Sequence, residues 1–181
     1  MQLDYQLAEP DILTHQLFIL SQSKSFQRRR ARGRMFLLLI YMITGMFIWQ
    51  RNGPVTAALF YVICFPLYFL YRRMEARQYE KHISNYVHEQ FKDSFQQHFT
   101  LQWDDTTITS TTGSNKHNLA WLELESVTEI SALVMLNFRN NQSILLPKNK
   151  IAELPLFLET LEEKANSLGV PYDRNLSWKW S

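Results

Sequence analysis

Histidine, acidic and cysteine side chains are the residues of this sequence whose types could support catalysis or metal binding. The five histidines are scattered, and the two nearest, His82 and His88, are six residues apart, which places them on different faces of a helix. A metal site needs ligands clustered in space, typically at i and i+4 on a helix. The spacing therefore predicts no metal site.

The acidic pairs and the single cysteine also lack a catalytic arrangement. Asp104-Asp105 falls in a predicted turn and Glu162-Glu163 on a predicted helix surface, where solvated charge is the ordinary role. Cys64 lies inside an apolar run, so the chain has neither an internal disulfide nor a cysteine-based zinc cluster. The sequence also contains no glycine-rich phosphate loop and no Gly-x-Ser-x-Gly element. We expect a protein that is not an enzyme and that uses no cofactor.

The strongest pattern lies in residues 28–73. Two runs without a charged residue, 35–49 and 54–71, are separated by the short break 50–53. The bilayer core holds no water, so a spanning segment must be helical to satisfy its backbone and must exclude charge. The pattern predicts a two-helix transmembrane hairpin; a buried helical hairpin of a soluble protein and a signal peptide are the alternatives.

Basic and aromatic residues at the ends of the runs predict how the hairpin is anchored. Each run is shorter than the ~20 apolar residues usually needed, but long arginine side chains extend the span toward the headgroups. Tryptophan favours the membrane interface. The expected membrane-anchoring residues are Arg28, Arg29, Arg30, Arg32, Arg34, Trp49, Arg72 and Arg73.

Charge asymmetry predicts the orientation. Short flanks rich in lysine and arginine stay in the cytoplasm, and here both outer flanks are basic whereas the connecting loop has Arg51 alone. Asn52-Gly53-Pro54 suits a tight extracytoplasmic turn. We expect a two-pass protein with both termini in the cytoplasm.

The charge is unevenly distributed along the 181 residues. Residues 1–97 contain 12 Lys and Arg against 7 Asp and Glu, whereas residues 98–181 contain 7 against 10. A nucleic-acid-binding domain would be basic, so no nucleic-acid partner is expected. The basic half surrounds the predicted hairpin, which makes the lipid bilayer its expected partner.

Helical and extended segments flank the hairpin. Residues 1–27 contain an alternating stretch typical of a strand, then a helix from Pro10 to about Ser21. Residues 74–97 continue the second span as a juxtamembrane helix with one apolar stripe. That stripe leaves three partners open, which are the soluble domain, the N-terminal helix, or a second copy in a homo-oligomer.

Residues 98–175 change to an alternating pattern and predict a cytoplasmic α+β domain. Strands are expected at 99–103, 106–111, 118–122, 127–130, 133–138 and 142–146, followed by a helix at 154–168. We expect Trp121 to be buried, and we expect the strand 133–138 to bury one face, which is either Leu133 and Met135 or, preferably, Val134, Leu136 and Phe138. An antiparallel sheet with one C-terminal helix has a pleckstrin-homology-like outline.

The last segment, 176–181, places Trp178 and Trp180 on one side of an extended chain. Exposed tryptophan is unfavourable in a free tail, so we expect the pair to dock. Its own sheet, the membrane interface and a protein partner are the three surfaces considered, and the two tryptophans are candidate partner contacts.

This order of parts resembles a known family. The residues that carry the resemblance are the basic segment 28–34 before a two-pass hairpin, Leu119-Ala120-Trp121, the apolar strand 133–138, and Ile144-Leu145-Leu146-Pro147-Lys148 before the last helix. Together they are similar to the YcxB-like proteins, over most of the chain, although Leu122 stands where that family usually has serine. The resemblance implies a small bacterial protein of the inner membrane and supplies no catalytic residues.

Two functions are compatible with these observations. The first is a membrane-tethered interaction or regulatory module that presents a small cytoplasmic domain to a protein partner. The second is a sensor of anionic lipid, suggested by the pleckstrin-like outline and the juxtamembrane arginines. The acidic balance of residues 98–181 favours the first.

Overall fold

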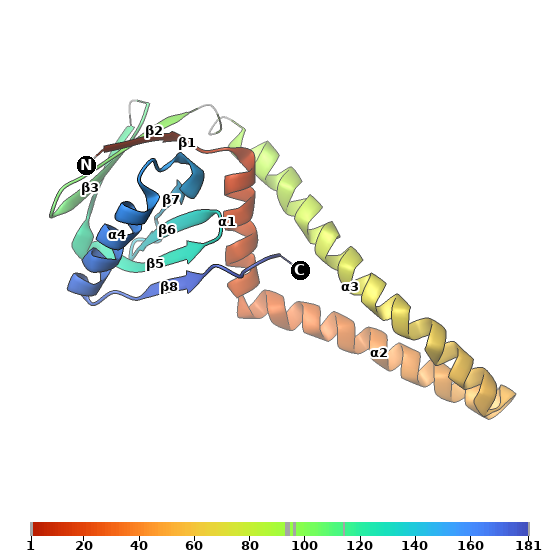
Figure 1. Cartoon of the computed structure of the whole chain (residues 1–181). Helices are drawn as coiled ribbons and strands as arrows, with labels where there is room; N and C mark the ends of the chain where they lie inside the picture. The colour runs from red at the N-terminus through yellow and green to blue at the C-terminus, as the bar shows by residue number, and fades with distance from the viewer. Residues whose placement is uncertain (1, 93–94, 96, 114, 181) are drawn as a thin grey trace. The chain divides into compact units, whose positions relative to one another are not determined.

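The computed structural model describes residues 2–92, 95, 97–113 and 115–180, and the chain divides into two compact units (Figure 1). The first unit comprises the described residues up to His15 together with Asn85–Lys179. The second comprises Gln16–Ser84 and Trp180. Each unit is described by itself below.

The first sheet of the first unit contains the N-terminal strand. Its order is β1 (Gln2–Gln6), β2 (His98–Trp103), β3 (Thr107–Thr112) and β4 (Asn115–Ala120), and all three pairings are antiparallel. The ring of Tyr5 in β1 stacks on Phe99 in β2 at 5.7 Å. The strand expected in a separate segment 1–27 therefore belongs to the same sheet as residues 98–120. Residues 98–175 are not self-contained, because without β1 the backbone of β2 would lose its partner on one side.

The second sheet has the order β7 (Ser143–Pro147), β6 (Leu133–Phe138), β5 (Leu124–Ile130) and β8 (Tyr172–Asn175). The pairs β5–β6 and β6–β7 are antiparallel, whereas β8 runs parallel to β5. The expected single antiparallel sheet is thus two sheets, one of them mixed. The α+β class is confirmed.

The C-terminal helix α4 (Leu154–Leu168) has the predicted limits. Pro155 lies in its first turn, where a missing backbone N–H costs nothing, and Gly169 ends it with φ of 66°. The backbone N–H of Gly169 closes the last turn on the carbonyls of Ala165 and Asn166. Leu161 and Ala165 are buried, and Figure 1 shows α4 lying in front of the second sheet.

Strand β6 is buried on both faces. The preferred face, with Val134, Leu136 and Phe138, is buried as expected, but Leu133 and Met135 on the opposite face are at most 1% exposed as well. The expectation of a single buried face was therefore wrong. A central strand covered on both sides carries apolar residues at successive positions instead of alternating ones, and β6 lies between β5 and β7.

The second unit is built on two long helices, α2 (Lys24–Asn52) and α3 (Pro54–Phe91). Ser23 alone separates α2 from α1 (Glu9–Gln22), and its hydroxyl accepts a hydrogen bond from the backbone N–H of Phe26. The break between α2 and α3 is also a single residue, Gly53, whose φ of 88° favours glycine. The expected four-residue break is therefore shorter, and helix α2 extends past the end of its apolar run.

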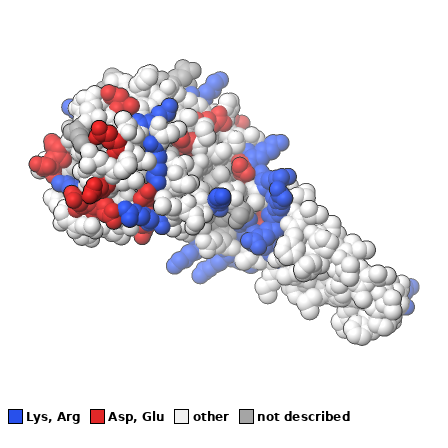
Figure 2. Space-filling view, in the orientation of Figure 1, with Lys and Arg blue, Asp and Glu red and all other residues white. Residues whose placement is uncertain are grey.

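Both helices are long and apolar enough to cross a membrane. Figure 2 shows an uncharged surface along them, with basic side chains near its ends. Most of their large apolar side chains are exposed, among them Phe36, Phe47 and Phe65, each at least 60% exposed. Helix α3 continues past the second apolar run, as the pattern of residues 74–97 predicts, but it ends at Phe91, short of the expected residue 97. Residues 93, 94 and 96 lie outside the described part of the chain.

A small-residue contact joins α2 to α3. Gly45 is buried beside Tyr61, and a Cβ atom at Gly45 would clash with the ring of Tyr61. The Tyr61 hydroxyl donates to the carbonyl of Met42, one turn away, at 3.4 Å. Close approach at small residues is typical of helix pairs in membranes.

Candidate binding site

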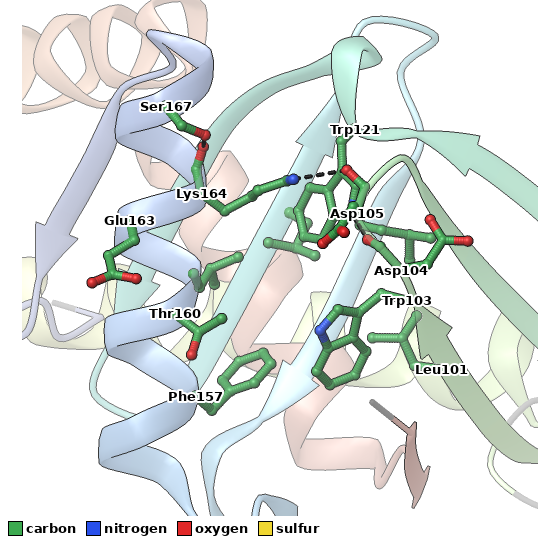
Figure 3. A pocket seen from close by; sticks show the side chains of 13 residues that line it. Leu101, Trp103, Asp104, Asp105, Trp121, Phe157, Thr160, Glu163, Lys164 and Ser167 are labelled. Atoms are coloured by element: carbon green, nitrogen blue, oxygen red, sulfur yellow. Dashed lines mark hydrogen bonds between the residues drawn. The ribbon is translucent and has the colours of Figure 1, made fainter.

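The candidate site of the first unit is a cavity of about 640 Å³ between α4 and the strand ends of the first sheet (Figure 3). Leu101, Ile108, Leu136 and Leu161 provide its apolar lining, and all four are buried. Sheet residues and helix residues thus contribute to one cavity. Its size is in the range of small-ligand sites.

Two contacts from α4 lie at the ends of the cavity. At one end, the ring of Phe157 packs edge-to-face on Trp103, with the ring centroids 5.6 Å apart. At the other end, Nζ of Lys164 lies 5.6 Å above the ring of Trp121 and donates to the carbonyl of Asp105 at 2.8 Å. Phe157 and Lys164 are seven residues apart, about 10 Å along the helix. The cavity between them has room for one large side chain.

Trp121 is fixed by the turn that follows β2. It lies in a short 3-10 helix (Trp121–Glu123) and not in the predicted strand, because β4 ends at Ala120. Its indole Nε1 donates to the carbonyl of Asp104 at 2.8 Å, and the residue is 6% exposed. The buried position expected for this ring is confirmed.

The mouth of the cavity is acidic. The carboxylate of Asp104 accepts hydrogen bonds from the backbone N–H groups of Thr107 and Thr106, and these bonds lower the pKa of Asp104 to about 2. Asp104 is therefore ionised at neutral pH. Asp105 and Glu163 also line the cavity, and Lys164 is the single basic residue among those that line it. Figure 2 shows acidic side chains gathered over the region of α4.

The arrangement is suited to binding. Its polar groups are carboxylates, hydroxyls and an ammonium that is already paired, and they surround an aromatic and aliphatic interior. Among the described residues, no three histidine, cysteine or acidic side chains are grouped so that they could hold a metal ion.

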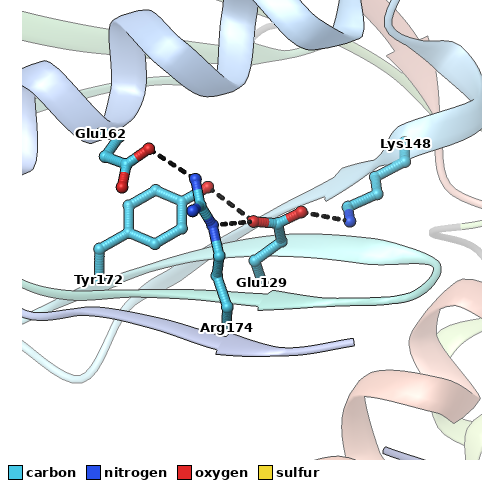
Figure 4. Close-up of polar contacts among 5 residues, drawn as sticks. All are labelled: Glu129, Lys148, Glu162, Tyr172 and Arg174. Carbon is cyan, nitrogen blue, oxygen red and sulfur yellow. Dashed lines mark hydrogen bonds and ion pairs between the residues drawn. The ribbon is translucent and has the colours of Figure 1, made fainter. Parts of the chain in front are cut away.

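A second polar cluster lies around Glu129 in β5 (Figure 4). This residue is 4% exposed, and its carboxylate accepts from Nζ of Lys148 at 2.6 Å, from the Tyr172 hydroxyl at 3.0 Å and from Nε of Arg174 at 3.2 Å. Arg174 also pairs with Glu162 of α4. The cluster thus connects β5, β8, α4 and the turn after β7.

The partners of Glu129 compensate the charge of its buried carboxylate. Burial alone would raise the pKa of Glu129, but the hydrogen bonds from Lys148 and Tyr172 and the charge of Lys148 lower it below its ordinary value. Burial and the neighbouring Glu129 charge raise the pKa of Tyr172, so that its hydroxyl keeps its proton. A buried carboxylate with three donors stabilises the attachment of β8.

The predicted anchoring residues divide into two groups. Arg30 and Arg34 turn toward Glu75 of α3, at 3.4 and 3.0 Å, and all three side chains are largely buried. The remaining predicted residues are exposed: Arg28, Arg29, Arg32, Trp49, Arg72 and Arg73.

The two tail tryptophans are in different surroundings. The indole Nε1 of Trp180 donates to the carbonyl of Ala76 at 3.0 Å, and its ring stacks on Phe26 and lies under Arg30. Trp180 is therefore docked on the helices of its own unit, a surface that was not among the three considered. Trp178 is half-buried, and its backbone N–H donates to the carbonyl of Asn175.

No pattern in the sequence predicted the cavity. Trp103, Trp121 and Phe157 were expected on separate elements, and only the fold brings them together. Glu129 did leave a signal, since it is the single charged residue in the otherwise uncharged stretch 126–138. No family profile, curated protein sequence or solved structure matches the chain.

Proposed function

We propose that this protein is a non-enzymatic, membrane-tethered interaction module whose first unit presents the cavity beside α4 to a protein partner. The observation that carries the proposal is an aromatic-lined cavity with an acidic mouth, on a chain that also has two helices long enough to span a bilayer. The helices supply the tether, and the cavity supplies the contact.

Membrane insertion is supported by the exposed apolar surface of α2 and α3. The most apolar stretches of the two helices are only 6% and 11% buried, which is unfavourable in water and favourable in a lipid bilayer. The basic flanks at residues 28–34 and 72–73 favour cytoplasmic termini. The resemblance to the YcxB-like proteins supports a bacterial inner membrane as the location.

Two residues in the segments that carry that resemblance, Trp121 and Lys148, have structural roles here. Trp121 forms one end of the cavity, and Lys148 pairs with the buried Glu129. The eight described strands form two four-stranded sheets, and α4 follows the first seven of them along the chain, which also supports the pleckstrin-homology-like outline. Both points favour a binding domain.

Site-specific photo-crosslinking in cells tests the proposal. A photoreactive phenylalanine analogue at Thr160, an exposed residue that lines the cavity, should crosslink to a discrete protein product. Ser167→Trp, which places a large side chain at the cavity, should abolish that product. Asn166→Trp is the matched control, because Asn166 is exposed on the same helix but does not line the cavity.

The analogue at Lys116, an exposed position in β4, serves as the positional control. Equal products from Thr160 and Lys116, or products from Thr160 that persist in Ser167→Trp, would show that the cavity is not the contact. Products that are lipids and not proteins would favour the second candidate function.

That second function, the sensing of anionic lipid, is favoured by the exposed side chains of Arg28, Arg29 and Arg32. Basic residues beside a membrane span attract anionic headgroups by about 1 kcal/mol each. The acidic mouth of the cavity is unfavourable for a phosphate headgroup. Lipid contact therefore belongs to the helix flank, and partner binding belongs to the first unit.

A further inference from the structure

We infer that the cavity beside α4 takes a peptide segment in which a large apolar side chain is flanked by lysine or arginine. This inference rests on the proposed function and adds the chemistry of the partner. Its basis is the combination of an aromatic interior with a mouth of predominantly negative charge.

The aromatic and aliphatic interior of the cavity is the reason to expect a large apolar side chain in the bound peptide. Phe157 contacts Trp103 of β2, and Lys164, about 10 Å away along α4, contacts the turn after β2 and the ring of Trp121; the buried Leu136 and Leu161 also line the cavity. A phenylalanine or leucine side chain inserted there would be removed from water on most sides. Burial of a large apolar group is the main favourable contribution in contacts of this kind.

The acidic residues at the mouth of the cavity are the reason to expect lysine or arginine beside that side chain in the bound peptide. Asp104, Asp105 and Glu163 line the cavity against one basic side chain, and the carboxylates of Asp104 and Glu163 point outward from it (Figure 3). The basic one, Lys164, is already held by the Asp105 carbonyl and the Trp121 ring. The local field therefore attracts cations and repels carboxylates and phosphates.

Within the cavity an ammonium already lies on an aromatic face. The contact of Lys164 with Trp121 is a cation–π interaction, in which a positive charge is attracted to the electron-rich face of the ring. Trp103 offers a second indole at the opposite end. A guanidinium or ammonium beside the inserted side chain can use the same type of contact.

The experiment uses the full-length protein labelled with 5-fluorotryptophan in nanodiscs of zwitterionic lipid. The five tryptophans give separate 19F resonances, which single Trp→Phe variants assign. Three peptides are titrated: Ac-KRFLRK-NH2, the charge-reversed Ac-EDFLDE-NH2, and Ac-KRSSRK-NH2, which keeps the charges without the apolar pair. Trp49, in the helical hairpin, is the internal reference.

We expect Ac-KRFLRK-NH2 to shift the Trp103 and Trp121 resonances saturably, with little effect on Trp49. The other two peptides should bind at least about tenfold more weakly, since Ac-EDFLDE-NH2 carries the opposite charge and Ac-KRSSRK-NH2 lacks the apolar pair. The double variant Asp105→Lys/Glu163→Lys should weaken the first peptide by about tenfold. The control Glu125→Lys/Asp173→Lys has the same net charge, changes two exposed residues outside the cavity, and should leave binding unchanged.

Three other results would contradict the charge preference, the place of binding or the site itself. If the acidic peptide shifts Trp103 and Trp121 as strongly as the basic one, the cavity is a binding site but the charge preference is wrong. If both charge variants weaken binding equally, the attraction is to the whole domain and not to the mouth. If no peptide moves either resonance, the cavity does not bind peptides, and the proposed function loses its site as well.

Discussion

The carboxylate of Glu75 in α3 lies 3.0 Å from the guanidinium of Arg34 in α2, and the same oxygen lies 3.4 Å from Arg30. The three side chains are between 10% and 22% exposed. Two of the arginines that the sequence suggested as lipid contacts are therefore engaged within the protein. The ion pairs join the two long helices at the end away from Gly53.

Loss of the Glu75 carboxylate should loosen this end of the helix pair. Glu75→Gln removes the charged carboxylate that Arg30 and Arg34 share, at an expected cost of about 2–3 kcal/mol. Spin labels at Gln27→Cys and Gln78→Cys in a Cys64→Ser background report the separation of the helices by pulsed electron paramagnetic resonance. We expect a broader distance distribution in Glu75→Gln and no change in Glu80→Gln, where the carboxylate is exposed. A sharp, unchanged distribution in Glu75→Gln would show that the ion pairs do not hold the helices.

Trp180 should stabilise the same end of the helices. Its ring stacks on Phe26 and its Nε1 donates to Ala76. Trp180→Ala removes the stacking and the hydrogen bond and should cost about 2 kcal/mol, whereas Trp180→Phe removes the hydrogen bond and should cost about 1 kcal/mol. The spin-label distances again provide the measurement. A broader distance distribution in Trp178→Ala but not in Trp180→Ala would contradict this role of Trp180 and would assign it to Trp178.

The Glu129 cluster should contribute strongly to the stability of the first unit. Glu129→Ala leaves Lys148 and Arg174 without their shared carboxylate, and breaking a buried ion pair in this way costs about 3–5 kcal/mol. We expect the thermal unfolding midpoint to fall by about 10 °C. Glu125→Ala changes an exposed residue of the same strand and should have little effect. Equal midpoints for both variants would make the cluster energetically unimportant.

His15 should make stability depend on pH. Burial lowers the pKa of His15, and its Nε2 has no hydrogen-bond partner among the described residues. The unfolded chain takes up this proton at about pH 6.5, whereas the folded chain resists it to lower pH, so the free energy of unfolding falls as the pH drops below 6.5. Thermal midpoints at pH 7.5 and 5.5 should therefore differ less in His15→Phe than in the wild type. His82→Phe, at an exposed position, is the control; the same pH dependence in wild type and His15→Phe would contradict the assignment.

Local signals in the sequence predicted the helices well. Pro155 and Gly169 set the limits of α4, because proline is favoured in a first turn and glycine after a last turn. Strand β8 escaped prediction, because Tyr172-Asp173-Arg174-Asn175 has no apolar alternation. It is held by parallel pairing with β5 and by the contacts of Glu129, which depend on residues more than forty positions away.

The candidate site could not be predicted from the sequence either, because it also depends on residues far apart in the chain. The cavity combines the end of β2, the 3-10 turn at Trp121 and one face of α4, and no local pattern relates these three. Trp121 was recognised as buried, but its hydrogen bond to Asp104 depends on the turn after β2. The hairpin, in contrast, depends on composition along a continuous segment, and residues 28–73 suffice to predict it.

The most direct test of a membrane-tethered module is the accessibility of single cysteines in intact bacterial cells that express the full chain. The native Cys64 is replaced by serine, and one cysteine is introduced either at Asn52, beside the turn of the hairpin, or at Asn149, an exposed residue of the first unit. We predict that a membrane-impermeant maleimide labels Asn52→Cys in intact cells and labels Asn149→Cys only after the membrane is permeabilised. Labelling of Asn149→Cys in intact cells, or protection of Asn52→Cys until lysis, would contradict the account.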